Sequence, residues 1–455
     1  MSLLFLLGLD GGRLLTVERL VEKGKLPIFE ELLKHSTTSY LDSTIPPITI
    51  PAWGVIFSGK NPGKLGCVDF IRPSRGYRPL LNKYGKEKWV WDYLCERNIP
   101  CAIFRAISIN PYRIKLGFFT DFKKCFPKNP KLILKEREIS PEMSYEEKIK
   151  ITMKNFERES EIMLRFMRKN MPHRFVVFTT AMIDAVSHLT HKEKRIEEAY
   201  VLVDEFLERI LPVLRKRGFS LMVVSDHGIK KVEKRANINR MFERVGLLNP
   251  REDIKKHLTL SLFKKVISSN LIRKLFHNFR IASAIRKRKI EGMRMEDLFN
   301  QIDFSSTKLF GFGTCTPSEY TLVWVNDERF ELGKKENRIE KNELKEMLKE
   351  NFPKIVEDVY EKKEVWHGDK MDNLPDFVVK LNKKYTSEYR LFTGVTMKCE
   401  SFVHSKDGLF IFTDFSGKER KHVNISNQDI TPIILGLFKM KIPKVIDGKN
   451  LSTRF

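Results

Sequence analysis

The sequence is short of several features that would place the protein in well-marked classes. Its six cysteines include no C-x-x-C pair and no zinc-finger spacing, which argues against a disulfide scaffold and indicates a reduced, cytoplasmic chain. No apolar run reaches 18 residues, which excludes a membrane-spanning helix. Gln occurs only twice, whereas Lys, Glu and Ile are abundant, a composition that indicates a heat-loving source. No Ser/Gly-rich linker and no internal repeat is present.

Acidic residues are also in short supply relative to basic ones. The chain has 83 Lys and Arg residues against 58 Asp and Glu residues, a formal net charge of +25. This excess favours an anionic partner, such as a phosphate-bearing small molecule, a nucleic acid or an acidic membrane surface, and a generally basic proteome is the alternative explanation. Hydrophobic residues make up 42% of the 455 residues, enough for a sizeable core in one large α/β domain with insertions or in several domains.

Short apolar runs alternate with helical patterns over the first half of the chain. The first run lacks a basic start and a small-residue cleavage site and stops at Asp10, so it indicates a buried strand and not a signal peptide. The alternation predicts an α/β fold with a mainly parallel sheet covered on both faces. The expected strands are residues 3–9, 101–107, 175–180 and 221–224, the expected helices are 16–35, 141–170 and 192–217, and the later runs 320–325, 377–381 and 409–412 are expected to extend the same sheet.

The composition changes between about residues 230 and 303. From residue 251 to residue 294 there are 13 Lys or Arg residues and three acidic ones. We therefore expect one α/β body of residues 1–230 and 304–455, interrupted by a basic, mostly helical insertion of residues 231–303. Apolar residues recur at helical spacing between residues 257 and 281, so residues 250–300 are expected to form a lid or side module. Peripheral contact of this segment with an anionic membrane is the second hypothesis.

Three carboxylates follow expected strands. Asp10 follows the first, Asp184 and then His188 follow the third, and Asp226 and His227 follow the fourth. Ligands of open α/β sheets gather at the carboxyl ends of the strands. A single Asp at such a place is most often a helix cap, but three at equivalent positions, two of them with a histidine, are hard to explain as caps. A mixed Asp/His set suits zinc, manganese or iron better than calcium.

A hydroxyl group precedes an expected helix in the segment 43–53, which reads S-T-I-P-P-I-T-I-P-A-W. Pro51 lies where a helix would begin, so Thr49 is expected near a helix N-terminus, where partial positive charge favours an oxyanion. An ordinary Thr cap is the simpler interpretation of an isolated threonine. Beside a metal cluster, however, such a hydroxyl can ionise and act as a nucleophile at neutral pH.

In these segments the chain resembles the type I phosphodiesterase/nucleotide pyrophosphatase family of the alkaline phosphatase superfamily. Each matching piece is weak by itself, but their order and spacing are specific and extend over nearly the whole chain. The pieces are G-L-D-G at 8–11, the segment 43–53, S-G-K-N-P-G at 58–63, residues 184–188, S-D-H-G at 225–228, I-D-F-S-S-T-K at 302–308, L-P-D at 374–376, residues 404–408 and D-I-T-P at 429–432.

The resemblance implies an alkaline phosphatase-like three-layer sandwich and a metal-dependent hydrolase of phosphodiester or pyrophosphate bonds. It further implies that Thr49 attacks phosphorus and forms a phosphothreonine, which activated water then hydrolyses. Two divalent ions are implied, with zinc expected and manganese as the alternative. His191 is interpreted as a surface residue or a neighbour of the ligands. One ion would be held by Asp10, Thr49, Asp226 and His227, and the other by Asp184, His188 and His404.

The chain also departs from the family pattern. Leu65 stands where many members have the histidine of a His-Gly pair, and residues 67–70, C-V-D-F, lack an Asn that holds a phosphate oxygen in animal enzymes. Nucleotide specificity and the preference for diesters over monoesters are therefore open. The expected partner is an anionic phosphate ester, no specific nucleic acid is expected, and the oligomeric state is open.

Three alternative functions fit the sequence less well. A phosphotransferase or mutase of the same superfamily fits less well with the T-x-P-A-W segment and with residues 304–308. A sulfatase is disfavoured, because Thr49 cannot become the formylglycine that a Cys or Ser supplies. A basic membrane- or nucleic-acid-binding protein on the same scaffold conflicts with the presence of all seven implied ligands.

Overall fold

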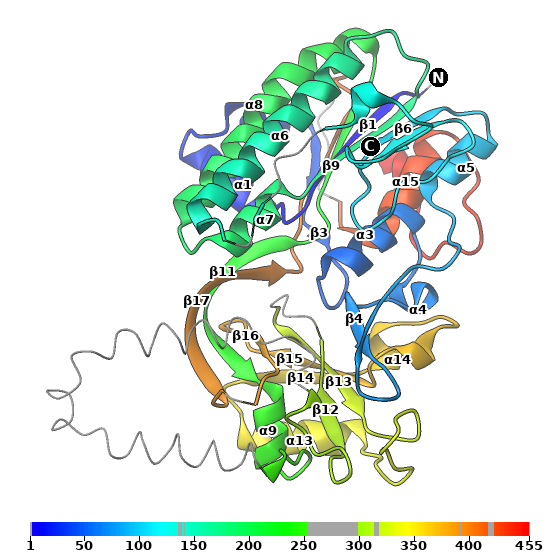
Figure 1. Ribbon diagram of the computed structural model, residues 1–455. Coiled ribbons are helices and arrows are strands. Elements are labelled where there is room, and N and C mark those ends of the chain that lie inside the picture. Colours follow the sequence, from blue (N-terminus) through cyan, green and yellow to red (C-terminus); the bar gives the residue numbers. More distant parts are fainter. Residues whose placement is uncertain are drawn as a thin grey trace, which may run out of the picture.

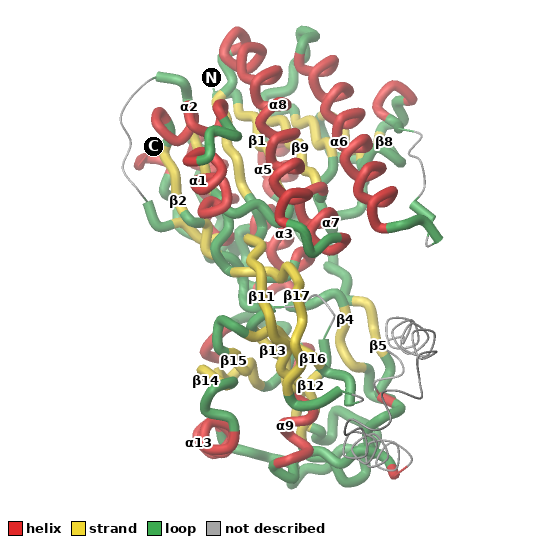
Figure 2. Tube along the Cα trace, turned by 90° about the vertical axis from the view of Figure 1, so that its left-hand side faces the viewer, coloured by secondary structure: helices red, strands yellow, loops and turns green. Residues whose placement is uncertain are grey.

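The molecule has two lobes joined by a pair of long strands (Figure 1, Figure 2). The computed structural model describes residues 2–134, 139–140, 142–252, 299–313, 318–391, 393–416 and 423–454. One lobe contains a large sheet with helices on both faces, and the other contains smaller sheets, with β11 (Gly228–Asn237) and β17 (Thr396–Ser405) running between them. Within the described ranges, every helix is too short or too polar to span a lipid bilayer.

The large sheet has the strand order β2-β18-β10-β1-β9-β6-β7-β8. Its centre, from β10 to β7, is parallel, and β18 and β8 run antiparallel to their inner neighbours. The central strands are continuous apolar runs because both of their faces are covered. The strands are β1 (Leu4–Leu9), β2 (Thr37–Ser39), β6 (Cys101–Phe104), β7 (Gly117–Thr120), β8 (Cys125–Phe126), β9 (Phe175–Thr180), β10 (Ser220–Val224) and β18 (Phe410–Thr413).

Alternate residues of β1 face two separate cores. Phe5 and Leu7 pack with α1, α2, α6, α7 and α8 on one face, and Leu4 and Leu6 pack with α3, α5 and α15 on the other. The predicted α/β sandwich with a mainly parallel sheet between two helical layers is therefore confirmed. The helices are α1 (Leu14–Glu22), α2 (Pro27–His35), α3 (Thr49–Ser58), α5 (Val90–Glu96), α6 (Tyr145–Met167), α7 (Met182–Leu189), α8 (Glu193–Arg217) and α15 (Ile430–Leu437).

The helix predicted over residues 16–35 is interrupted, so the prediction of one continuous helix is wrong. The chain forms α1 and α2 with a turn between them, in which Gly24 takes a φ of 67°. Pro27 occupies the first turn of α2, where its missing N–H group costs no helical hydrogen bond.

Two of the three later runs predicted to extend the large sheet do not join it. β13 (Tyr320–Val325) and β15 (Phe377–Leu381) pair antiparallel in a separate sheet of order β12-β13-β15-β14. Trp324 and Val379 of this sheet share a core with α9 and α13, so the second lobe buries its own apolar side chains. Only the run 409–412 joins the large sheet, as β18. The lobe contains α9 (Ile238–Arg244), β12 (Leu309–Gly311), α13 (Lys341–Asn351), β14 (Val356–Glu361), α14 (Lys362–Val365) and β16 (Tyr385–Glu388).

Short elements link the two lobes and join segments that are remote in the chain. The hairpin of β4 (Ile71–Pro73) and β5 (Pro79–Leu81) carries Tyr77, whose ring stacks on Phe304 of the second lobe at a centroid distance of 3.7 Å. Near the large sheet, β3 (Leu41–Asp42) pairs in parallel with β19 (Ile425–Ser426). In the described part of the chain, the remaining short helices are α4 (Pro62–Leu65) and the 3₁₀ helices Pro130–Leu132, Met371–Asn373, η4 (Asn427–Asp429) and Ser452–Arg454.

Most of the predicted insertion of residues 231–303 lies outside the described residues, which omit 253–298. Its described start completes β11 and forms α9. The lid, side-module and membrane-contact hypotheses for residues 250–300 concern the same stretch. They stay predictions, as does the division of the chain into a body and an insertion.

Candidate metal centre

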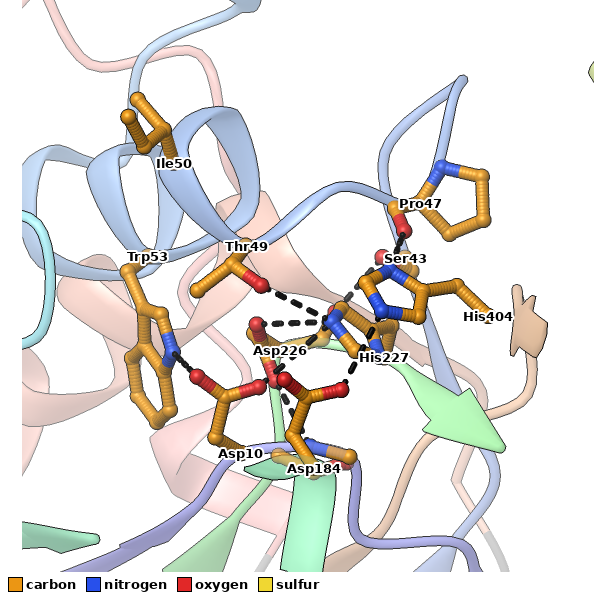
Figure 3. A network of polar contacts seen from close by, with 12 residues as sticks. Asp10, Ser43, Pro47, Thr49, Ile50, Trp53, Asp184, Asp226, His227 and His404 are labelled. Carbon is orange, nitrogen blue, oxygen red and sulfur yellow. Dashed lines mark hydrogen bonds and ion pairs between the residues drawn. The ribbon is translucent and has the colours of Figure 1, made fainter. Parts of the chain in front are cut away.

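The three carboxylates predicted from strand ends lie together at one edge of the large sheet (Figure 3). Asp10 follows β1, Asp226 follows β10, and Asp184 lies in the first turn of α7, just after β9. Because β1 pairs in parallel with both β9 and β10, the three strands end at the same edge. The side chains are directed toward one another from three different segments.

Asp184, His188 and His404 form one group of donor atoms. Oδ1 of Asp184 lies 3.2 Å from Nε2 of His188 and 3.1 Å from Nε2 of His404. The two Nε2 atoms are themselves 3.2 Å apart. Asp184 and His188 are four residues apart on α7 and so share one face of the helix, while His404 comes from the end of β17.

His227 joins the other two carboxylates. Its Nε2 atom lies 3.5 Å from Oδ1 of Asp10 and 3.3 Å from Oδ2 of Asp226. The backbone N–H of Gly11 donates to the second oxygen of Asp226 at 3.2 Å. Asp10, Asp226 and His227 are all buried, so these contacts are shielded from bulk water.

Backbone carbonyls fix the orientation of two of the imidazole rings. Nδ1 of His404 donates to the carbonyl of Pro47 at 2.9 Å, and Nδ1 of His227 donates to the carbonyl of Gly228 at 3.2 Å. A proton on Nδ1 leaves a lone pair on Nε2, and both Nε2 atoms face the carboxylates. The rings are thus oriented as metal ligands commonly are.

His404 reaches the centre because β17 pairs with β11. In this antiparallel pair Ile229 lies opposite His404 and Gly228 lies opposite Ser405. His227 immediately precedes β11, so the pairing brings the two histidines together. Their rings stack at a centroid distance of 3.7 Å. No local feature of the sequence around His404 indicates this partnership, which the sequence prediction took from the family resemblance alone.

Thr49 is the first residue of α3, and its Oγ1 atom lies 3.2 Å from Nε2 of His227. The N-terminus of a helix carries partial positive charge, which favours an oxyanion at this place. One turn later, the indole N–H of Trp53 donates to Oδ2 of Asp10 at 3.4 Å (Figure 3). Trp53 had no role in the sequence prediction, although its spacing of four residues from Thr49 places both on one helix face.

A family model for type I phosphodiesterase / nucleotide pyrophosphatase matches residues 4–394 of the chain. The chain belongs to this family. Phosphodiesters and nucleotide pyrophosphates are the substrates that this family hydrolyses, within the alkaline phosphatase superfamily. The matched range includes Asp10, Thr49, Asp184 and Asp226 but ends before His404. Among curated proteins, no match to the chain is found.

Burial dominates the acid–base behaviour of three side chains in this phosphodiesterase-family centre. Burial raises the pKa of Asp10, and the negative charge of Asp226 raises it further. The pKa of Asp226 is raised by burial and then by the Asp184 carboxylate. Burial lowers the pKa of His227, and the neighbouring His404 ring lowers it further. In this half of the centre the charged forms of both carboxyl groups and of the imidazole are therefore unfavourable.

Around Asp184, the charges of neighbouring side chains outweigh the effect of burial on the pKa values. Burial by itself would raise the pKa of Asp184, but His188 and His404 outweigh it, and the pKa lies well below its usual range. Burial likewise opposes the charged form of His188, but the Asp184 carboxylate outweighs it and raises the pKa of this histidine. The side chain of His188 is 34% exposed, so the centre opens to solvent on this side.

The residues of this phosphodiesterase-family centre fit divalent metal ions. One oxygen of each carboxylate is buried without a hydrogen-bond partner, namely Oδ1 of Asp10, Oδ1 of Asp184 and Oδ2 of Asp226. Such oxygens are costly to bury unless a cation neutralises them. Carboxylate oxygens combined with imidazole lone pairs are a donor set typical of zinc, and manganese also accepts it.

The donor atoms separate into two overlapping groups. Atoms within 4.8 Å of one another come from Asp184, His188 and His404, and from Asp10, Asp184 and His227. The first group equals the set predicted for one ion. The second shares Asp184, whereas the set predicted for the other ion was Asp10, Thr49, Asp226 and His227. All seven predicted residues lie in one cluster, but the role of each as a metal ligand stays a prediction. His191 is exposed and makes none of the contacts described above.

Proposed function

We propose that this protein hydrolyses phosphodiester or pyrophosphate bonds with two divalent metal ions and a phosphothreonine intermediate on Thr49. One observation carries the proposal. Three carboxylates, each with a buried oxygen that has no hydrogen-bond partner, lie together with three histidines, and one of these histidines, His227, contacts the hydroxyl of Thr49 at the start of α3. Membership of the phosphodiesterase family supports the reaction class. The metal requirement, the intermediate and the individual residue roles are the proposal itself.

Zinc ions, with manganese as the alternative, would be held by Asp10, Thr49, Asp226 and His227 and by Asp184, His188 and His404. When bound, such ions would neutralise phosphoryl oxygens and favour the ionised form of the Thr49 hydroxyl. The protein's contribution is orientation, because Pro47 and Gly228 hold the His404 and His227 rings with their Nε2 lone pairs turned inward. Trp53 similarly fixes one oxygen of Asp10 and leaves the other free.

The chemistry then has two displacements at phosphorus. Oγ1 of Thr49, having lost its proton to solvent, forms a bond to phosphorus while the bond to the leaving oxygen breaks, and that oxygen takes a proton from water. Water next attacks the phosphothreonine, the bond from phosphorus to Oγ1 breaks, and the threonine hydroxyl is restored. The N-terminus of α3 favours negative charge on Oγ1 in both steps, because its free N–H groups point toward this end of the helix.

The substrate would be an anionic phosphate ester that enters from the side of His188, the most exposed side chain of the centre. A net charge of +25 favours encounter with such a substrate. We place the reaction in the cytoplasm, in keeping with the six cysteines and the absence of any C-x-x-C pair.

Hydrolysis of bis(p-nitrophenyl) phosphate by the full chain tests the proposal. We expect turnover with Zn²⁺ or Mn²⁺, loss of turnover after chelation, and recovery when metal is added back. p-Nitrophenyl phosphate run in parallel separates diesterase from monoesterase activity. Absence of turnover on both compounds, together with phosphate transfer to an added alcohol or sugar, would replace the hydrolase with a phosphotransferase.

A further inference from the structure

The peptide that links Asp226 and His227 is held by two side chains from distant parts of the chain. The hydroxyl of Ser43 donates to the Asp226 carbonyl at 2.6 Å, and Nδ2 of Asn427 donates to the same oxygen at 2.8 Å. Nδ2 of Asn427 also lies 3.4 Å from the Ser43 hydroxyl oxygen, which accepts from it. All of these groups are buried, so the hydrogen bonds do not compete with water.

Strand pairing explains why these two residues meet. β3 and β19 run parallel, with Leu41 opposite Ile425 and Asp42 opposite Ser426. Ser43 and Asn427 are the next residues along the two strands, so the same register brings them side by side. Asn427 also lies beyond the residues that the family model matches, as does His404.

The orientation of this one peptide determines the directions of two predicted metal ligands, the side chains of Asp226 and His227. In an extended strand, neighbouring side chains point to opposite faces, yet Asp226 and His227 both face the centre, with Nε2 and Oδ2 3.3 Å apart. The backbone after β10 must therefore leave the extended course at this point. Two hydrogen bonds to the Asp226 carbonyl occupy both lone pairs of its oxygen. They therefore fix the direction in which the backbone turns after β10.

Ser43 also contacts the other ligand-bearing segments. Its backbone N–H donates to the carbonyl of Lys406, two residues after His404. The chain from Ser43 leads through Pro47, whose carbonyl orients the His404 ring, to Thr49. Figure 3 includes Ser43 in the polar network of the centre, to which it is linked through the Asp226 carbonyl. Ser43 is thus connected to three of the segments that meet at the centre, those of Asp226, His404 and Thr49.

We propose that Ser43 and Asn427 are positioning residues of the metal centre, which clamp the Asp226 carbonyl so that Asp226 and His227 together face the metal. The inference rests on the metal-binding part of the proposed function. Metal affinity therefore depends on Ser43 and Asn427, although neither residue is itself a predicted metal ligand. Loss of a residue that orients a ligand commonly weakens metal binding by about 10–100-fold.

The test compares Ser43→Ala, Asn427→Ala and the double variant in the full-length, metal-stripped protein. The readouts are the Mn²⁺ dissociation constant by calorimetry, the visible spectrum of the Co²⁺-loaded protein, and the free energy of unfolding. We expect each single variant to weaken Mn²⁺ binding about 10-fold. The double variant should lose more than the product of the two, because the buried carbonyl then keeps no donor. Ser43→Thr, which keeps a hydroxyl donor, should restore most of the affinity.

Thr431→Val is the matched control. Thr431 is equally buried, and its hydroxyl donates to the carbonyl of Ile56 at 2.7 Å, well along α3 from Thr49. This variant should lose stability but keep the wild-type Mn²⁺ affinity and Co²⁺ spectrum. An equal loss of affinity in the control would reduce the clamp to general packing and overturn the proposal, as would wild-type affinity in the double variant.

If the double variant does not fold, the single variants and Ser43→Thr decide by the same readouts. Failure of the clamp proposal can be distinguished from failure of the proposed hydrolase function. A protein that binds Mn²⁺ through an intact clamp but hydrolyses no phosphate ester would refute the hydrolase alone. A wild-type chain that binds no divalent metal would refute the clamp together with the metal requirement.

Discussion

The imidazole rings of His227 and His404 stack with their centroids 3.7 Å apart and their planes inclined by 21°. The two residues are remote in sequence and meet because Ile229 of β11 lies opposite His404 of β17. The strands that join the two lobes therefore also complete the candidate metal centre. Pairing of β11 with β17 has a direct chemical consequence, since it brings a third imidazole to carboxylates at the end of the large sheet.

Replacing His404 should remove one predicted metal ion and leave the other. We expect His404→Ala to lower the zinc content by about one ion per chain, because this ring is proposed to share an ion with Asp184 and His188, whose donor atoms lie beside it. Metal analysis of the dialysed protein measures this. The control is His191→Ala, at an exposed histidine just after α7, which should keep the full content. Equal metal content in His404→Ala and wild type would contradict the ligand assignment.

Replacing Thr49 should separate chemistry from metal binding. Thr49→Ala is expected to lower turnover of bis(p-nitrophenyl) phosphate by a factor on the order of 10³ or more, because the proposed nucleophile is lost. Thr49→Ser should retain part of the activity. Both variants should stay folded, since Thr49 makes one side-chain contact to His227 within the centre. Steady-state kinetics beside circular dichroism checks this, and wild-type turnover by Thr49→Ala would rule out the phosphothreonine.

Asp226→Asn should stabilise the metal-stripped protein while abolishing tight metal binding. The pKa of Asp226 is raised by burial and by Asp184, so its charged form is unfavourable in the folded state. A carboxyl whose pKa is raised on folding loses stability as the pH rises from its unfolded value through its folded one. At pH 8 the neutral amide should therefore raise the unfolding free energy by about 1–3 kcal/mol, and by less at pH 5.

Urea unfolding with chelator present, at both pH values, measures this difference. The amide oxygen can still accept the N–H of Gly11, as Oδ1 of Asp226 does at 3.2 Å, so packing is preserved. With metal present the order should reverse, because only the wild type gains binding energy. A variant less stable than wild type under chelation would show that Asp226 is stabilising without an ion.

The substitution His173→Phe should reduce the loss of folding stability at acidic pH. His173 is buried beside the rings of Phe118 and Phe166, its Nδ1 has no hydrogen-bond partner, and burial followed by Arg217 lowers its pKa to about 4. Between about pH 6.5 and 4 the unfolded chain takes up a proton at this residue that the folded chain does not. Stability is therefore lost as the pH falls through this window.

We expect the variant's unfolding free energy to exceed that of the wild type by an amount that grows on acidification, by about 2 kcal/mol between pH 7 and 4. Chemical denaturation at several pH values measures this. His35→Gln, at an exposed position at the end of α2, is the control and should leave the pH slope unchanged. Parallel pH profiles for wild type and His173→Phe would refute the role of His173.

Local pattern was sufficient for the central strands and for the carboxylates that follow them. β1, β9 and β10 were predicted from their apolar runs, since a strand covered on both faces needs apolar residues at every position. Asp10, Asp184 and Asp226 followed from strand ends, because parallel strands place their carboxyl ends at one edge. Thr49 followed from the prolines around it, which mark a helix start.

Tertiary structure alone decided which strands share a sheet and which distant side chains complete the centre. An apolar run such as β13 fits a central parallel strand or a strand of a second sheet equally well, and its partner β15 determines the choice. In the same way, the meeting of Ser43 with Asn427, of Trp53 with Asp10 and of His227 with His404 depends on pairing between segments remote in the chain. Short-range periodicity carries no information on such contacts, because register and packing are fixed only when the whole core assembles.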